Sequence, residues 1–350
     1  MSLKSFFKDL AGSKTELPHF IHIPNENTDD ADGLAGDFEP QQHYFTVRVN
    51  EMFLSQNRKW FKEIEPMVVC LSTYIYGEQE IDNPFIVGKS LIESNMQNAA
   101  EGIVFNDTRV AGIHPYSGGR LIICIVLCQS VTKDYLANTL EFVEKIAGVF
   151  NENITTLMGN YLKIANVIIG GIDKLLDSNA IQPLFGFRKE FDRDSNDHFS
   201  PGYYVMIDKS PETWKPENFF VKENHLFFGK DLASSIPFRH DEFVLFSVTR
   251  SDTRSDIKLL PAWQSYKKIL DELKVSEVSQ DLKDKLKGML RVLNVEIQQS
   301  PDFTQPHAQA FINQRIDEVG KLIEPKFNWS ASPKKSVDFW DTMDTKIRAI

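Results

Sequence analysis

Side chains suited to chemistry gather at one place in the sequence, a turn at residues 113–120 and the short segment before it. A carboxylate, an imidazole and a guanidinium occur together there, and such a set can serve acid–base catalysis or bind a polar ligand. A ligand or partner contact at this place would use five residues: Asp107, Arg109, His114, Tyr116 and Arg120. The competing interpretation, which the sequence favours, is a loop that feeds a buried strand, with Tyr116 as a packing aromatic.

The glycines of this turn raise the question of an anion site. Pro115, Gly118 and Gly119 allow a tight turn whose backbone N–H groups could face an anion, and Arg120 would add charge. Phosphate-binding and dinucleotide-binding loops, however, place their glycines at the start of a helix. Here the glycines precede the apolar run 121–128, which is typical of a strand buried on both faces. The familiar phosphate-binding schemes are therefore excluded.

Metal and covalent chemistry find no support in the sequence. It contains no HExxH, CxxC or GxSxG pattern. His19 and His22 are three residues apart in a predicted strand, so their side chains would point to opposite faces. The three cysteines lie in apolar segments and are predicted to be buried free thiols: Cys70, Cys124 and Cys128. We expect no metal and no cofactor.

The acidic segment 25–39 is the other stretch that suggests a ligand. Four aspartates lie within it: Asp29, Asp30, Asp32 and Asp37. Their spacing does not match the ligand positions of an EF-hand loop, which also needs a glycine at its sixth position. We predict a mobile, solvated loop.

Composition limits the classes of partner. The 39 basic and 49 acidic residues give a net charge of −10, and no basic stripe accompanies them. Because phosphate neutralisation supplies most nucleic-acid affinity, we expect no nucleic-acid partner. No run reaches the roughly 20 apolar residues that span a bilayer, and no signal peptide is recognised at residues 1–16, so we expect a cytoplasmic protein without a membrane span. The 26 phenylalanines predict aromatic packing between layers.

Hydrophobic periodicity predicts an α+β fold, with a β-rich body, a central helical pair and a helical C-terminal region. An N-terminal arm at residues 1–16 would precede the body at 17–258, which is followed by helices at 259–323 and a docking tail at 324–350. Alternating or β-branched runs predict strands at 17–23, 42–49, 66–76, 85–92, 103–105, 119–131, 181–187, 202–207, 219–221, 226–228 and 242–249. Apolar stripes at helical spacing predict the central pair at 134–150 and 154–175 and three C-terminal helices, the last two separated at Ser300–Pro301–Asp302.

Several short motifs resemble a known group. These motifs together span most of the chain. They are Phe105-x-Asp107, His114-Pro115-Tyr116-x-Gly118-Gly119, Asp134-Tyr135, Gly202-Tyr203-Tyr204 and Ser300-Pro301-Asp302. This layout resembles uncharacterised bacterial proteins encoded beside conflict or defence genes. The resemblance implies a bacterial source and a component of a larger system, and it gives no residue a role.

Taken together, these features favour a non-catalytic interaction or assembly protein. Clean apolar stripes on the C-terminal helices and an aromatic tail would dock on a protein partner or on a second copy, the tail through Phe327, Trp329, Phe339 and Trp340. The alternative is an enzyme or ligand-binding protein with a pocket near Asp107, His114 and Arg120.

Overall fold

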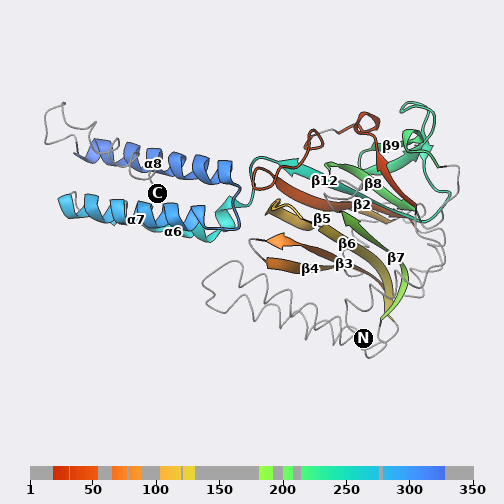
Figure 1. The fold of residues 1–350 in the computed structure, drawn as a ribbon, viewed down its shortest axis with the longest axis horizontal. Helices are drawn as coiled ribbons and strands as arrows, with labels where there is room; N and C mark the ends of the chain where they lie inside the picture. The colour runs from red at the N-terminus through yellow and green to blue at the C-terminus, as the bar shows by residue number, and fades with distance from the viewer. Residues whose placement is uncertain are drawn as a thin grey trace. The chain divides into compact units, whose positions relative to one another are not determined.

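Two compact units make up the chain in the computed structural model (Figure 1). The structure describes residues 19–30, 32–53, 65–76, 79–87, 103–119, 121–130, 181–191, 200–207, 214–275 and 279–327. The first unit contains residues 1–40 and 44–251, and its described residues form β-sheets. The second contains residues 41–43 and 252–350, and its described residues form helices. The α+β class predicted from the sequence is confirmed.

The larger sheet of the first unit has five antiparallel strands in the order β1-β8-β12-β2-β5. Short connections join two of these strands to other sheets: residues 116–120 connect β5 to β6, and residues 238–242 connect β11 to β12. The strands are β1 (His19–Ile23), β2 (Tyr44–Phe53), β5 (Ile103–Pro115), β8 (Gly202–Ile207) and β12 (Phe243–Ser251). The order joins segments far apart in sequence, so this sheet depends on long-range pairing.

Two smaller sheets accompany it. The four-stranded antiparallel sheet has the order β4-β3-β6-β7, and the three-stranded sheet has the order β11-β10-β9. The strands of the first are β3 (Glu65–Tyr76), β4 (Gln79–Val87), β6 (Leu121–Ser130) and β7 (Ile181–Phe191). Those of the second are β9 (Phe219–Lys222), β10 (His225–Phe228) and β11 (Ile236–Pro237).

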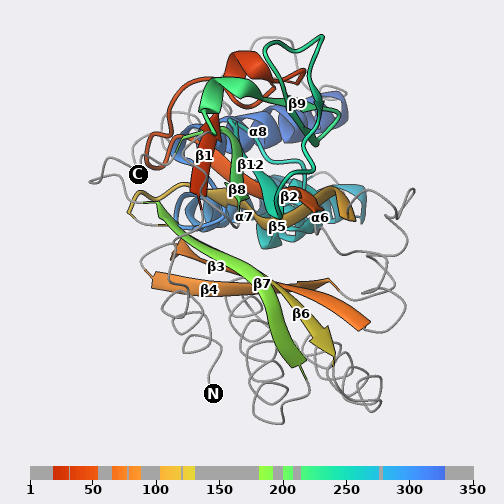
Figure 2. The ribbon, with the colours of Figure 1, turned by 90° about the vertical axis from the view of Figure 1, so that its right-hand side faces the viewer.

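The five-stranded sheet is buried on both faces. Along β12, Val244, Phe246 and Val248 contribute to a core shared with the four-stranded sheet. The intervening Phe243 and Leu245 contribute to a second core shared with the three-stranded sheet. This alternation follows from the two-residue side-chain period of a strand. Figure 2 shows the two larger sheets face to face.

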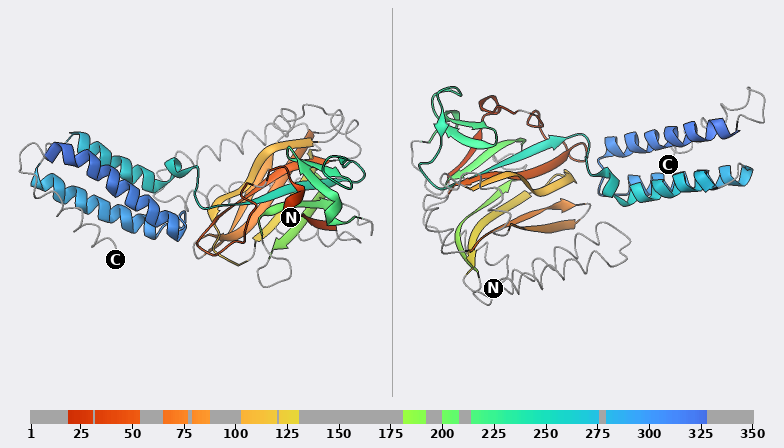
Figure 3. Two further views of the ribbon diagram at one scale, coloured as in Figure 1. Left: turned by 90° about the horizontal axis from the view of Figure 1, so that it is seen from above. Right: turned by 180° about the vertical axis from the view of Figure 1, so that it is seen from behind.

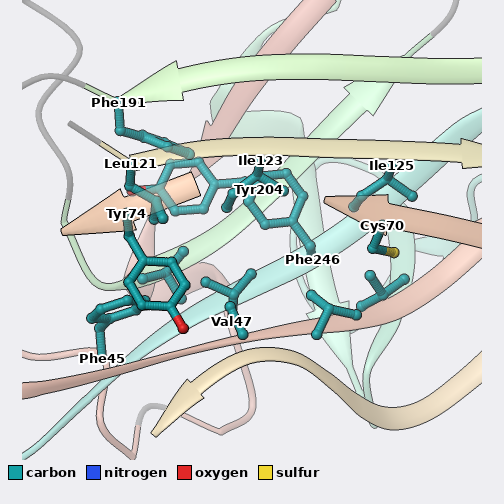
Figure 4. Packing of buried hydrophobic residues seen from close by; sticks show 14 of the residues in the cluster. Phe45, Val47, Cys70, Tyr74, Leu121, Ile123, Ile125, Phe191, Tyr204 and Phe246 are labelled. Carbon is teal, nitrogen blue, oxygen red and sulfur yellow. The ribbon is translucent and has the colours of Figure 1, made fainter. Parts of the chain in front are cut away.

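Aromatic rings fill much of the core between the two larger sheets, as the phenylalanine count predicted (Figure 4). Tyr204 stacks on Phe246 with centroids 5.3 Å apart, and the edge of Phe191 meets Tyr204 at 5.3 Å. Stacked and edge-to-face pairs of this kind add to the stabilisation that burial gives.

Strand β5 differs from its prediction. The sequence predicted a strand at 103–105 and a loop before Ile113, whereas β5 is continuous from Ile103 to Pro115. It pairs with β2 along its length, and three register shifts absorb its extra residues. The extra residues of these bulges interrupt the alternation by which a strand is predicted from sequence.

The acidic segment 25–39 combines exposed aspartates with two buried apolar side chains. Leu34 and Phe38 are buried, although the four aspartates are exposed. Asp29 donates its backbone N–H to the Val221 carbonyl (3.2 Å), and the Asn25 side chain donates to the Leu34 carbonyl (2.8 Å). The predicted solvation is confirmed for the four aspartates, and two buried apolar side chains anchor the segment to the core.

The described residues of the second unit include three α-helices that pack against one another (Figure 3). They are α6 (Pro261–Val275), α7 (Gln280–Gln298) and α8 (Gln305–Phe327). Ser279 caps α7 by accepting the Leu282 backbone N–H at 3.1 Å. The predicted break at 300–302 is present, and Ser300 Oγ accepts the Asp302 backbone N–H there at 3.2 Å.

Residues 252–260 belong to the helical unit, which therefore begins earlier than the expected residue 259. The buried Arg254 side chain explains this. Its guanidinium makes two hydrogen bonds to the Asp256 carboxylate (2.6 and 2.9 Å) and one to the Asp302 carbonyl (2.6 Å). One side chain thus joins the segment before α6 to the turn between α7 and α8.

Some predictions concern residues outside those that the structure describes. They are the arm at 1–16, the central helical pair at 134–150 and 154–175, Arg120, and the tail residues Trp329, Phe339 and Trp340. Helix α8 continues to Phe327, past the expected start of the tail at 324. No helix in the described ranges has the length and apolar character needed to cross a bilayer.

Candidate functional site

The turn singled out by the sequence connects two different sheets. It leaves β5, an edge strand of the five-stranded sheet, and enters β6, an inner strand of the four-stranded sheet. Gly118 and Gly119 have φ angles of +84° and +74°, which few other residues adopt. A Cβ on Gly119 would lie 2.5 Å from Ile75 Cδ1. The glycines therefore allow the chain to cross between sheets, which is a structural role.

His114 lies inside the packing between the sheets. Its side chain is 2% exposed, and its ring stacks on Tyr74 with centroids 4.9 Å apart. The Tyr76 ring is T-shaped to the same ring with centroids 5.4 Å apart, and the centroid of the Phe45 ring lies 6.2 Å from it. Tyr116 is also buried, and its ring packs against the Phe38 ring with centroids 5.3 Å apart. Both candidates are thus part of the core.

Arg109 does not share this environment, and the Asp107 side chain and Arg120 lie outside the described set. Arg109 is exposed and pairs in register with Arg48, whereas His114 pairs with Phe45. Because Phe45 and Arg48 are three residues apart on β2, the two positions on β5 are separated by about 10 Å. Asp107 lies in β5, on the segment before Arg109. The described geometry does not bring an acid–base set together at this turn.

A second polar group, which sequence reasoning missed, surrounds Glu51 on β2. The Glu51 side chain is 0% exposed. Its Oε1 accepts a hydrogen bond from Arg239 Nη2 at 2.8 Å and lies 3.4 Å from His225 Nδ1. Its Oε2 accepts the Leu226 backbone N–H at 2.7 Å. A buried carboxylate is thus surrounded by three donors, which offset the cost of removing it from water.

Arg239 balances the charge of Glu51 within the Glu51 cluster, formed by Glu51, His225 and Arg239. Arg239 also donates Nη1 to the Phe238 carbonyl at 2.7 Å and lies 5.1 Å from the centroid of the Phe53 ring. The hydrogen bond to Glu51 raises the pKa of His225 above its usual value, and partial burial opposes this effect. The cluster combines one permanent cation with a histidine whose charge depends on pH.

The Glu51 cluster anchors the hairpin of β9 and β10. Its two-residue turn is Glu223–Asn224, with φ angles of +50° and +66°. Asn224 Oδ1 accepts hydrogen bonds from Asn50 Nδ2 (3.0 Å) and from the Tyr203 hydroxyl (3.1 Å). Asp29 Oδ2 accepts the Glu223 backbone N–H at 2.8 Å. The one sequence signal was a glutamate inside the apolar strand 44–53, and its partners lie more than 170 residues away.

Two cysteines behave as the sequence predicted. Cys70 and Cys124 are buried free thiols on the neighbouring strands β3 and β6. Cys70 faces the core between the larger sheets, as do Ile123 and Ile125, so Cys124 faces the other side of its sheet. Burial raises the pKa of the Cys70 thiol and makes it a poor nucleophile. The side chain of Cys128 lies outside the described set.

Within the described ranges, no group of three His, Cys, Asp or Glu side chains is placed to hold a metal ion. The comparisons with known proteins add no family. No family model matches the chain, and no curated protein matches it.

The helical unit carries exposed apolar side chains. Val292 and Val295 lie on α7 three residues apart, so they share a face, and Val292 is 67% exposed. Gly288, four residues before Val292, has open space where a Cβ would be. Leu286, Leu290 and Leu293 are buried on the opposite side of the helix. We call Gly288, Val292 and Val295 the outer face of α7.

Proposed function

We propose that the protein is a non-catalytic interaction or assembly protein, a cytoplasmic component of a multi-protein system, and that its helical unit is the docking element. The exposure of large apolar side chains carries the proposal. Six are exposed among the described residues, and four of them lie in the smaller, helical unit: Leu259, Val292, Val295 and Leu322. Val292 and Val295 share one face of α7, and exposed apolar side chains on a common face are typical of protein interaction sites.

The chemistry of the chain supports a protein partner. The net charge of −10 opposes binding to the phosphates of nucleic acid. The outer face of α7 has no bulky side chain at Gly288, so another helix could approach it closely. The resemblance to proteins encoded beside bacterial conflict or defence genes extends the proposal to a component of a defence system.

The second hypothesis, an enzyme or ligand-binding protein with a pocket near Asp107, His114 and Arg120, has less support. The His114 ring is enclosed by Phe45, Tyr74 and Tyr76. A ligand would reach it only if the packing between the two sheets opened, and opening a core costs a large part of the folding free energy.

The test places charge on the outer face of α7. We expect the double variant Val292→Glu/Val295→Glu to lose self-association measured by light scattering, or to lose proteins that co-purify from the source cells and are quantified by mass spectrometry. Gln264→Glu/Gln305→Glu is the matched control, because it adds the same charge at exposed positions on α6 and α8. An unchanged mass and an unchanged partner set in the double variant would contradict the proposal.

A second experiment removes residues 328–350. We expect this truncation to reduce the same associations if the aromatic tail contributes to docking. Both measurements are compared with circular dichroism spectra, so that a loss of folding is distinguished from a loss of contact.

A further inference from the structure

The contact between His225 and Glu51 joins the β9–β10 hairpin to the central sheet next to the turn of the hairpin, whose apolar side chains are buried in the second core. His225 begins β10, directly after the turn Glu223–Asn224, and its side chain is 34% exposed. Glu51 lies on β2 and has no exposed surface. Solvent protons can therefore reach the imidazole, while the carboxylate that it faces is held in the core.

The donors to Glu51 differ in their response to pH. The Arg239 guanidinium and the Leu226 backbone N–H, at 2.8 and 2.7 Å, keep their protons throughout the neutral range. The imidazole of His225 alone gains or loses charge there. Its protonation state thus changes the attraction between the hairpin and β2 while the other two contacts stay in place.

We propose that His225 and Glu51 form a pH-sensitive latch that holds the β9–β10 hairpin against β2. The proposal concerns the first unit and does not depend on the docking role of the helical unit. Protonated His225 closes the latch by adding an ion pair to the buried carboxylate. Neutral His225 loses the ion pair, even where Nδ1 keeps a proton, and the end of the hairpin next to the turn opens locally more often.

The charged groups around the imidazole come from several elements. Glu51 on β2 and Glu223 in the turn favour its protonation, and Arg239, which follows β11, opposes it. Lys222 on β9 pairs in register with His225 and is a further cation beside it. Asp29, in the segment after β1, binds the Glu223 backbone N–H and places another carboxylate beside the turn. The favourable groups prevail, so the pKa of His225 in the folded protein lies above the ordinary value of 6.5.

The direction of the effect follows from this shift. The stabilisation from protonated His225 is fully present below the unfolded-state pKa of about 6.5 and is lost as the pH rises through the higher pKa of the folded protein. The local opening equilibrium of the hairpin changes by up to about tenfold for each unit by which the pKa is raised.

Hydrogen exchange of the full-length protein tests the latch. Protection factors, corrected for the intrinsic dependence of exchange on pH, are measured across residues 219–228 at a pH below and a pH above the neutral range. We expect the Leu226 amide to lose protection at the higher pH in the wild type and to show no such change in His225→Gln. His240→Gln is the matched control: His240 is an exposed histidine in the same unit, and we expect this variant to behave as the wild type does.

A measurement on the unmodified protein covers the case in which His225→Gln fails to fold. In an NMR titration, the Leu226 amide and the His225 ring should change with the same midpoint, above pH 6.5. A Leu226 amide that does not follow the His225 ring, or a loss of protection that persists in folded His225→Gln, would overturn the proposal.

Discussion

The His114 ring on β5 stacks on the Tyr74 ring on β3, with centroids 4.9 Å apart and 28° between the ring planes. The pair connects the edge of the five-stranded sheet to the four-stranded sheet, close to the turn between β5 and β6. A histidine that the sequence offered as an acid–base group is therefore a packing element at this crossing.

The first prediction concerns that histidine. His114→Ala should lower the free energy of unfolding by about 2–4 kcal/mol, because it removes a buried ring and leaves a cavity between Phe45 and Tyr74. His114→Phe, which keeps a ring, should cost less. Urea denaturation followed by circular dichroism measures both variants. A fully stable His114→Ala protein would contradict the packing role and revive the catalytic hypothesis.

Gly119 should resist substitution for two reasons. Its φ of +74° is unfavourable for other residues, and an added Cβ would lie 2.5 Å from Ile75 Cδ1. Gly119→Ala should therefore lower stability by about 1–2 kcal/mol. If the contact contributes, Ile75→Ala should recover part of the loss in a double-mutant cycle. Strictly additive losses would show that the backbone angle alone is responsible.

Gly288 should behave in the opposite way. It lies in the interior of α7, and no atom lies within 4 Å of the position of an added Cβ. Gly288→Ala should raise the stability of the helical unit by about 0.5–1 kcal/mol, since glycine loses more backbone freedom on forming a helix. Thermal unfolding measures the change. A lower midpoint would mean that this position is needed for close contact with another chain.

Arg254 should be essential to the helical unit. Its two hydrogen bonds to Asp256 and one to the Asp302 carbonyl depend on the planar guanidinium. Arg254→Lys should destabilise the unit by about 2–4 kcal/mol because it leaves buried acceptors without donors. Lys268→Gln, at an exposed position on α6, is the control for charge removal and should change little. Equal effects in the two variants would count against this assignment.

Tyr266 provides a prediction at high pH. Its hydroxyl donates to Glu318 Oε2 at 2.6 Å, and Arg315 Nη1 donates to the same oxygen at 2.7 Å. Burial, with a contribution from the Glu318 carboxylate, raises the pKa of Tyr266 to about 12. Folding therefore favours the neutral phenol, and the contribution to stability falls as the pH rises from about 10 to about 12.

Ultraviolet absorbance measures this ionisation. The titration curve of the wild type minus that of Tyr266→Phe should show a transition near pH 12. A transition near the ordinary tyrosine value of 10 would show that the phenol is not held in this way.

The sequence by itself determined the local elements. Strand β8 at Gly202–Ile207 and the helices after residue 260 follow from periodicity, since the side-chain periods of strands and helices are properties of the local chain. The glycines before β6 indicated a strand and not a phosphate loop. The buried free thiols of Cys70 and Cys124 followed from their apolar neighbours.

Only the tertiary structure decided which elements pair and which polar groups meet. β5 and β6 are consecutive in the chain and belong to different sheets, and Glu51 meets His225 and Arg239 across more than 170 residues. Such contacts depend on the packing of the whole unit, because a buried charge is tolerated only where distant donors converge on it. The local sequence thus specified the helices and strands. The packing of these elements against one another decided which residues became the partners of Glu51.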